Sequence, residues 1–319
     1  MNEFTLIDKY LKPLSIKKNN ALGLSDDIYY DYKKKIAISL DTYVHGVHFI
    51  SSNPEFFLKK IIRSSLSDLY CKGVKPESYF LSFSINNKLV THNWLKKINQ
   101  ILKSEQKKFK ITLSGGDTTK STKLTITVVV LGSSRHKPIL RSGCEANDDI
   151  YVTGNIGDSF LGLCIITKKY SFGKFNNYFL KSFYEPKIPI KLQPHLYKYA
   201  KSSIDISDGL LQDLSHLCLF KKLGALIDLK SLPLSSQCRN LIINGKIKLK
   251  DIFSRGDDYQ FLFTSAISNR KKIKCLSKNL SLKITKIGQI NNKKVINLKY
   301  NNEIFDARTI KMGYTHNFK

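Results

Sequence analysis

Leu113-Ser114-Gly115-Gly116-Asp117-Thr118-Thr119 lies between two runs that we expect to be strands, 109–113 and 124–131. Two adjacent glycines remove side chains at a point where we expect the chain to turn, so backbone N–H groups can meet the charged oxygens of a ligand. Asp117 adds a carboxylate there, and Mg²⁺ is typically held by carboxylates together with substrate phosphates. An ordinary hairpin turn remains the alternative, because Gly-Gly and Gly-Asp are common turn dipeptides.

The same local pattern, an aspartate among Gly, Ser or Thr beside an apolar run, recurs along the chain. It is found at 23–27, 41–42, 67–68, 203–209 and 254–259. The chain has 53 Lys+Arg against 25 Asp+Glu, yet acids adjoin as Asp-Asp at 26–27 and 257–258. Like charges this close repel unless cations or protons compensate. The pattern predicts several Mg²⁺ ions around a nucleotide polyphosphate, although Asp26, Asp148, Asp149 and Asp158 individually also fit helix caps or turns.

Length and composition indicate a globular protein of two domains. The 319 residues suit two units of about 150 residues each, and the polar segment 133–138 predicts a boundary that gives domains 1–137 and 138–319. No apolar run approaches the ~20 residues that span a bilayer, and the start lacks the apolar region of a signal peptide. We therefore expect a cytoplasmic protein without membrane contact. Six dispersed cysteines without a C-x-x-C pair predict reduced thiols.

The formal net charge of +28 raises the question of a nucleic-acid partner. The lysines are spread over the whole chain among many Asn and Ile, and no basic stripe interleaved with aromatic residues stands out. Nucleic-acid binding is therefore the weaker interpretation of this charge.

The order of expected elements in the first half, β-α-β-α-β-β, predicts an α+β layer with helices on one face of a mixed sheet. The second half predicts an α/β domain, with strands such as 149–153, 203–206 and 260–264 alternating with helices. The other face of the first sheet must be covered, and a second subunit is the simplest cover. We therefore expect a homodimer.

Eight motifs, in order, carry a resemblance to a known family. They are Gly23-x-x-Asp-Asp, Asp41-Thr-x-x-x-Gly-x-His48-Phe, Ser67-Asp68-Leu, Gly115-Gly116-Asp117-Thr-Thr, Arg141-Ser-Gly, Val152-Thr-Gly-x-x-Gly-Asp-Ser, Ile204-Asp205-Ile-Ser207-Asp208-Gly-Leu and Gly256-Asp-Asp-Tyr. Across nearly the whole chain this series resembles thiamine-monophosphate kinase. The resemblance implies the two-domain fold of the aminoimidazole ribonucleotide synthetase-like superfamily, dimerisation through the N-terminal sheet, and ATP use without a Walker loop.

The resemblance also implies a reaction and a set of site residues. ATP would phosphorylate thiamine monophosphate to thiamine diphosphate by direct in-line transfer, which asks mainly for positioning and charge neutralisation. The acceptor phosphate is already anionic, so neither a covalent intermediate nor a general base is expected. The implied metal ligands are Asp27, Asp41, Asp68, Asp117, Asp205 and Asp208. The implied ATP contacts are Gly115, Gly116, Arg141, Ser207 and the ring of Phe109, and the implied substrate contacts are His48, Asp257 and Tyr314.

Four positions depart from the family pattern. Leu40 stands where Thr or Ser is usual, Phe109 where Tyr is frequent, Asp257 in place of Glu, and Ser25 in place of Gly. Without the resemblance, His48 would be interpreted as a packed or surface histidine.

Two other functions are weighed beside the kinase. One is another ATP-dependent synthetase of the same superfamily; a selenophosphate-type enzyme would carry a reactive cysteine near its N-terminus, but the first cysteine is Cys71. The other is a basic nucleic-acid-binding protein, which predicts steeply salt-dependent binding.

Overall fold

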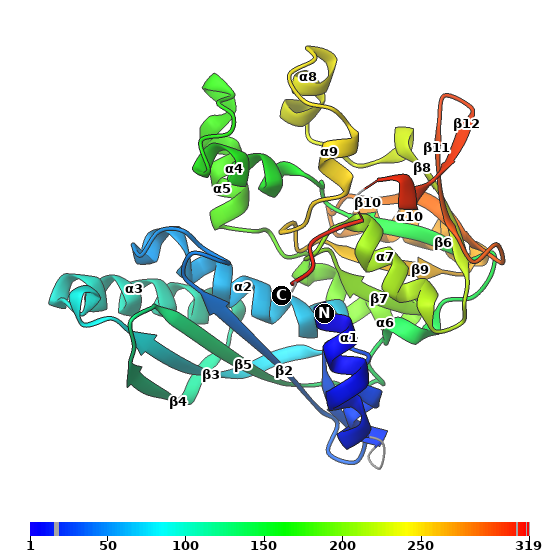
Figure 1. The fold of residues 1–319 in the computed structure, drawn as a ribbon. Helices are drawn as coiled ribbons and strands as arrows, with labels where there is room; N and C mark the ends of the chain where they lie inside the picture. Colours follow the sequence, from blue (N-terminus) through cyan, green and yellow to red (C-terminus); the bar gives the residue numbers. More distant parts are fainter. Residues whose placement is uncertain (16–18, 311, 317, 319) are drawn as a thin grey trace.

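The computed structural model describes residues 1–15, 19–310, 312–316 and 318, and within them the chain forms a five-stranded sheet and a seven-stranded sheet (Figure 1). The five-stranded sheet has the order β1-β2-β5-β3-β4, in which β3 and β4 are parallel and the other pairs are antiparallel. Its strands are β1 (Tyr29–Asp31), β2 (Ile36–Val44), β3 (Lys75–Ile85), β4 (Thr112–Lys120) and β5 (Thr125–Ser133).

Helices cover one face of this sheet, as the sequence predicts. α2 (Leu58–Cys71) and α3 (His92–Phe109) lie on the same side of the sheet (Figure 1). β5 explains why, because its residues alternate strictly: Ile126, Val128 and Val130 are buried under the helices, and the residues between them are partly exposed. The opposite face carries apolar side chains, with Leu40 63% and Phe80 37% exposed, so this face lacks a cover within the described chain.

The seven-stranded sheet has the order β12-β11-β8-β10-β6-β9-β7. Its strands are β6 (Asp149–Thr153), β7 (Ser202–Asp205), β8 (Gly224–Asp228), β9 (Phe261–Ser265), β10 (Ile284–Asn291), β11 (Ile296–Tyr300) and β12 (Glu303–Asp306). The remaining α-helices are α1 (Glu3–Leu6), α4 (Asp158–Ile166), α5 (Asn176–Tyr184), α6 (Leu196–Tyr199), α7 (Leu210–Leu219), α8 (Ser236–Ile243), α9 (Lys250–Phe253) and α10 (Arg270–Asn279). The sequence analysis missed α8, α9, β11 and β12.

Both faces of strands β6, β7 and β9 of this second sheet are buried, and one face joins the first sheet's core. Ile150 and Val152 of β6 pack in a core with Leu214 of α7. Tyr151, which points the other way, packs in a core that also contains Ile273 of α10 and the buried residues of α2. The two halves of the chain therefore share a hydrophobic core, and α2 also contacts β7.

Two local predictions near the double glycine are wrong. α3 continues to Phe109, so this residue ends a helix and does not begin a strand. Gly115, Gly116 and Asp117 lie inside β4, which runs on to Lys120, so they form neither a ligand-binding turn nor a hairpin turn. The register of β3 and β4 shifts between Tyr79 and Leu81, and a Cβ at Gly116 would lie 1.9 Å from the Leu81 carbonyl oxygen, so this position requires glycine.

The beginning and the end of the described chain lie side by side. The N–H of Glu3 donates to the carbonyl of His316 (3.1 Å), and the N–H of Phe318 donates to the carbonyl of Met1 (2.9 Å). The N and C labels are close together beside α1 in Figure 1. This pairing places the segment 312–316 against the loop that follows β7, where the N–H of Tyr314 donates to the carbonyl of Asp208 (3.1 Å).

Candidate functional site

Four aspartates predicted to bind metal come from four different elements and meet where α2 contacts β7. Asp27 lies in the loop before β1, Asp41 within β2, Asp68 near the end of α2, and Asp205 is the last residue of β7. The charges of Asp27 and Asp41 act on both Asp68 and Asp205, and Asp205 also acts on Asp68. We call these four residues the acid cluster.

Burial and mutual repulsion raise the pKa of three of the four carboxyl groups in the acid cluster. Burial, followed by the charges of Asp41 and Asp205, raises the pKa of Asp68 well above its usual range. Burial and the charge of Asp27 raise the pKa of Asp205 to about 7. Burial also raises the pKa of Asp41 to about 6, although the Tyr43 hydroxyl donates to its Oδ2 (3.2 Å). These carboxylates therefore sit in an environment that favours either protons or added cations.

Two cationic side chains of the chain itself compensate part of this charge. Lys72, fully buried just after α2, lies 2.9 Å from both Asp26 and Asp27 and donates to the carbonyl of Ser203 (2.7 Å). Arg141 pairs with Asp27 through its guanidinium, and its N–H donates to Asp26 (2.8 Å). Burial alone would raise the pKa of Asp27, but Arg141 and Lys72 hold it well below its usual range.

Despite these cations, the acid cluster has unused ligand atoms. Asp205 Oδ2 and Ser67 Oγ are buried and have no hydrogen-bond partner. A buried acceptor without a partner is costly, and a bound cation removes that cost. In the described parts of the chain, however, no group of three or more His, Cys, Asp or Glu side chains forms a metal site by itself. The geometry fits Mg²⁺, which usually keeps waters and combines one or two carboxylates with substrate phosphates.

Asp208 and Ser207 lie in the loop between β7 and α7, beside the acid cluster. Burial, followed by the charge of Glu3, raises the pKa of Asp208 to about 6. Ser207 is exposed, and its carbonyl accepts from the N–H of Asp257 (2.8 Å). This contact joins the loop to the segment that carries the next group of residues.

The three predicted substrate contacts lie in one region, although they come from three distant segments of the chain. They are His48, Asp257 and Tyr314. The His48 and His316 rings lie 5.6 Å apart, and the Tyr314 and His316 rings 5.0 Å apart. Asp257 pairs with Lys60 of α2 (2.7 Å), and both charges act on His48. The structure thus brings these residues together and adds Lys60 and His316, which the sequence analysis missed.

His48 has a defined hydrogen-bonding role. Its Nδ1 accepts from the N–H of Val44 (3.0 Å), so Nε2 carries the proton of the neutral ring. Burial, and then the charges of His316 and Lys60, lower the pKa of His48, which keeps the ring neutral at pH 7. His48 is therefore a hydrogen-bond donor through Nε2.

Asp117 is not brought to the acid cluster within one chain. Across the sheet, Asp41 is level with Val128, Leu81 and Gly116 in turn, so β4 lies three strands from β2. At ~4.8 Å per strand, that separation is about 14 Å. Gly115, Gly116 and Asp117 are all exposed on this edge strand. Any contact they make with the acid cluster must therefore involve another molecule or a different arrangement.

Phe109 is also away from the acid cluster. It is buried at the end of α3, and its ring packs 6.3 Å from that of Tyr70 and 5.9 Å from the Arg63 guanidinium. Its side chain is therefore a core residue, and the structure gives no support to a role in stacking on a nucleotide.

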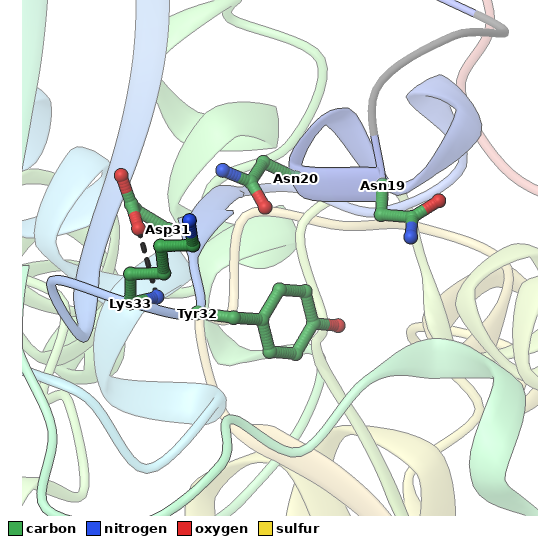
Figure 2. Close-up of a pocket in the computed structure, with 5 residues that line it drawn as sticks. All are labelled: Asn19, Asn20, Asp31, Tyr32 and Lys33. Atoms are coloured by element: carbon green, nitrogen blue, oxygen red, sulfur yellow. Dashed lines mark hydrogen bonds between the residues drawn. The ribbon is translucent and has the colours of Figure 1, made fainter.

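A hollow on the surface beside β1 is separate from these groups. It is lined by Asn19, Asn20, Asp31, Tyr32 and Lys33 (Figure 2). Asp31 is occupied by local contacts, since its Oδ1 accepts from the N–H of Lys33 and Lys34. None of the predicted site residues lines this hollow.

Lys72, Lys60 and Tyr43 are the interior residues of the site that the sequence analysis missed. Lys72 directly precedes Gly73, whose φ of +75° ends α2, and a lysine at a helix C-terminus is normally interpreted as a favourable but exposed charge. In a chain with 53 Lys+Arg, nothing in the sequence distinguishes the buried lysines from the others.

Comparison with known proteins supports a specific family. The domain family described as AIR synthase related protein, N-terminal domain, matches residues 25–134. A thiamine-monophosphate kinase of Buchnera aphidicola is 35% identical over 99% of this chain and 98% of its own length. The thiamine-monophosphate kinase of Haemophilus influenzae is 32% identical over 92% of this chain and 90% of its own length.

Solved structures agree with these matches over nearly the full length. A structure of AaThiL complexed with AMPPCP and TMP superposes with a TM-score of 0.82 at 26% identity and covers 96% of both chains. Thiamine monophosphate kinase from Aquifex aeolicus superposes with a TM-score of 0.76 at 26% identity and covers 91% of this chain and 97% of its own. A HypE–HypF complex, at 14% identity and a TM-score of 0.72, shares the fold.

Proposed function

This chain belongs to the thiamine-monophosphate kinase family, and from that premise we propose that it uses ATP to convert thiamine monophosphate into thiamine diphosphate. The observation that carries the proposal is the acid cluster, in which the buried Asp205 Oδ2 has no hydrogen-bond partner, with the His48, Asp257 and Tyr314 group nearby. A phosphoryl-transfer enzyme must position two anionic phosphates and neutralise their charge. Carboxylates that favour added cations, beside a half-exposed tyrosine ring and a neutral histidine, suit that task.

The proposed transfer is direct and in line. An oxygen of the acceptor phosphate forms a bond to the γ-phosphorus while the bond from that phosphorus to the β–γ bridging oxygen breaks, and ADP leaves. The acceptor oxygen is already anionic, so no side chain has to remove a proton from it. Several Mg²⁺ ions would neutralise the phosphates, and their proposed ligands are Asp27, Asp41, Asp68, Asp205 and Asp208, with Asp117 from a second molecule.

The proposed phosphate contacts of ATP are Arg141 and Ser207, together with the Gly115-Gly116 backbone of a second molecule. Arg141 is suited to this role because a guanidinium binds phosphate through two parallel hydrogen bonds. In this structure it pairs with Asp27, so a bound phosphate would share Arg141 with that carboxylate.

The substrate contacts proposed for thiamine monophosphate are His48, Asp257 and Tyr314. His48 offers the Nε2 proton as a donor, and Tyr314, which is 48% exposed, offers a ring face for stacking. These contacts would hold the organic part of the substrate while its phosphate faces the acid cluster.

We also propose that the enzyme is a homodimer. The open face of the five-stranded sheet exposes Leu40 and Phe80, and the neighbouring edge strand β4 carries Gly115, Gly116 and Asp117. A second copy across this face would bury the apolar side chains and supply the edge strand to the other molecule's acid cluster. The division of the chain at 137/138 remains a prediction. In the described parts of the chain, no helix is long and apolar enough to cross a membrane.

The test is ³¹P NMR of the purified protein with ATP, Mg²⁺ and thiamine monophosphate, with controls that each lack one component. A thiamine diphosphate signal that requires Mg²⁺ and is lost in Asp205→Asn and in Asp117→Asn is expected. Consumption of ATP only with a different acceptor would assign the chain another reaction of the same fold.

A further inference from the structure

Lys60 is the buried cation nearest to the proposed substrate contacts. Its side chain is 6% exposed, and its Nζ lies 2.7 Å from Asp257 Oδ1 and 3.6 Å from the centre of the Phe183 ring. An ammonium enclosed by a carboxylate and an aromatic face has little freedom to leave. Lys60 and Asp257 therefore form a fixed ion pair with a net charge near zero.

The same pair leaves one oxygen of Asp257 available. The Tyr259 hydroxyl also donates to Oδ1 (3.1 Å), so both side-chain contacts that the described residues make to this carboxylate fall on one oxygen. The Asp257 side chain is 28% exposed, and Oδ2 is not among the buried polar atoms that lack a hydrogen-bond partner, so this oxygen is open to a ligand.

The backbone holds Asp257 in this orientation. Asp257 has a φ of +70°, and its N–H donates to the carbonyl of Ser207 (2.8 Å). A Cβ at the preceding Gly256 would lie 1.8 Å from that carbonyl oxygen, so the two loops are in close contact. The backbone thus fixes the position of this carboxylate, whose charge acts on His48.

A neutral ion pair attracts a cation much less than a lone carboxylate does, but its free oxygen still accepts hydrogen bonds. Thiamine monophosphate offers two candidates: a positively charged thiazolium ring without N–H groups, and an uncharged pyrimidine ring with an amino group. We propose that Lys60 positions Asp257 so that Oδ2 accepts a hydrogen bond from the pyrimidine amino group, and that the pair does not act as the counter-charge of the thiazolium. The inference rests on the proposed substrate and specifies which of its rings this site recognises.

Isothermal titration calorimetry without ATP or turnover tests the proposal. The probes are thiamine monophosphate and its 4-oxo analogue, which keeps the thiazolium and the phosphate but replaces the amino donor with an acceptor. The wild-type protein should bind the amino form at least about tenfold more tightly, because the analogue sets two acceptors against each other. Asp257→Asn should reverse the preference, because an amide can donate to the oxo group.

Lys60 is tested by Lys60→Met and, in case that variant does not fold, by Lys60→Gln. Either variant should bring the affinity for thiamine monophosphate, divided by the affinity for the 4-oxo analogue, closer to one. Either should also raise the KM for thiamine monophosphate, with the KM for ATP little changed. Lys59→Met is the matched control, since the neighbouring Lys59 pairs with Glu185 (2.7 Å) in a partly exposed ion pair outside the site. It should leave the ratio unchanged.

Equal wild-type binding of the two probes, with loss of both in Asp257→Asn, would overturn the proposal and assign Asp257 to the thiazolium. An unchanged ratio in the folded Lys60 variants would overturn the role of Lys60. Absence of thiamine diphosphate in the ³¹P NMR experiment contradicts the proposed reaction, whereas the calorimetric ratio is measured independently of turnover.

Discussion

Lys72 is the residue on which the charge balance of the acid cluster most depends. It is fully buried and contacts Asp26, Asp27 and the carbonyl of Ser203. Lys72→Met should reduce the free energy of unfolding by about 3–5 kcal/mol, because removing one partner leaves buried charge without compensation.

Chemical denaturation of the wild type and Lys72→Met measures this loss. Lys97→Met is a suitable control, because Lys97 pairs with Glu55 at 3.4 Å in an exposed position where an ion pair contributes less than about 1 kcal/mol. Equal stability of the two variants would show that Arg141 alone compensates Asp27.

Asp205 gives the protein a pH-dependent stability. Its folded-state pKa of about 7 lies above the ~3.9 of an unfolded aspartate, so the folded chain binds more protons between these values. The metal-free protein should therefore lose stability as the pH rises from about 4 to about 7, and Asp41, with a pKa of about 6, acts in the same direction.

Thermal melting in EDTA at pH 5 to 8 measures this effect. Asp205→Asn should melt higher than the wild type at pH 8 and respond less to pH, and Mg²⁺ should raise the melting temperature of the wild type more than that of the variant. A variant with the same pH response as the wild type would assign the effect to other groups.

At the scale of elements, the segment 312–316 depends on α7 for its position. Gln212 of α7 donates to the carbonyl of Tyr314 (2.7 Å) and to Thr315 Oγ1 (3.1 Å). A Cβ at Gly313 would lie 2.6 Å from the Gln212 Cβ, which shows how closely the segment lies on the helix. Gln212→Ala should release Tyr314 and raise the KM for thiamine monophosphate about tenfold, the equivalent of roughly 1.4 kcal/mol of lost contacts.

Steady-state kinetics with each substrate varied in turn measures this effect. Ser215→Ala removes another partly buried polar contact of α7, a donation to the carbonyl of Gln212 (2.6 Å), and is expected to leave this KM near the wild-type value. An equal rise in the KM for ATP and thiamine monophosphate in Gln212→Ala would indicate a general loosening of α7.

The helices and strands also show which features of the fold local sequence patterns can predict. Strand β6 matches its predicted range, because five buried residues bounded by Asp148 and Gly154 leave little ambiguity. The polar run 103–108 does not look like part of a packed helix, yet α3 includes it, and Glu105 forms a buried pair with Arg63 (2.8 Å) that only the packing of α2 against α3 reveals. The acid cluster followed from the motifs, but the distance of Asp117 did not, since the order of strands in a sheet is not set by local residues.

At the scale of the whole molecule, the position of β4 allows a test of whether one site combines residues from two copies of the chain. If Asp117 serves the acid cluster of a second copy, Asp117→Asn and Asp205→Asn proteins that are each inactive should regain activity when mixed. A mixed dimer then has one site with both substitutions and one with neither, so up to about half of the sites in mixed dimers are intact.

The two variants are denatured together and refolded, and the rate is compared with that of each variant refolded alone. No recovery in refolded dimers would show that Asp117 acts within its own chain, or does not act at the site. Asp31→Asn, whose contacts lie beside β1, serves as the control for the effect of removing one carboxylate.

The pairing of Glu3 with the carbonyl of His316 has a consequence for the order in which the protein is made. Glu3 leaves the ribosome early and His316 late, so all four aspartates of the acid cluster are synthesised before Tyr314 and His316. A nascent chain can fold its first sheet before the contact between the Tyr314 and His316 rings can form. The contact proposed for Tyr314 is therefore among the last features of the site that the growing polypeptide acquires.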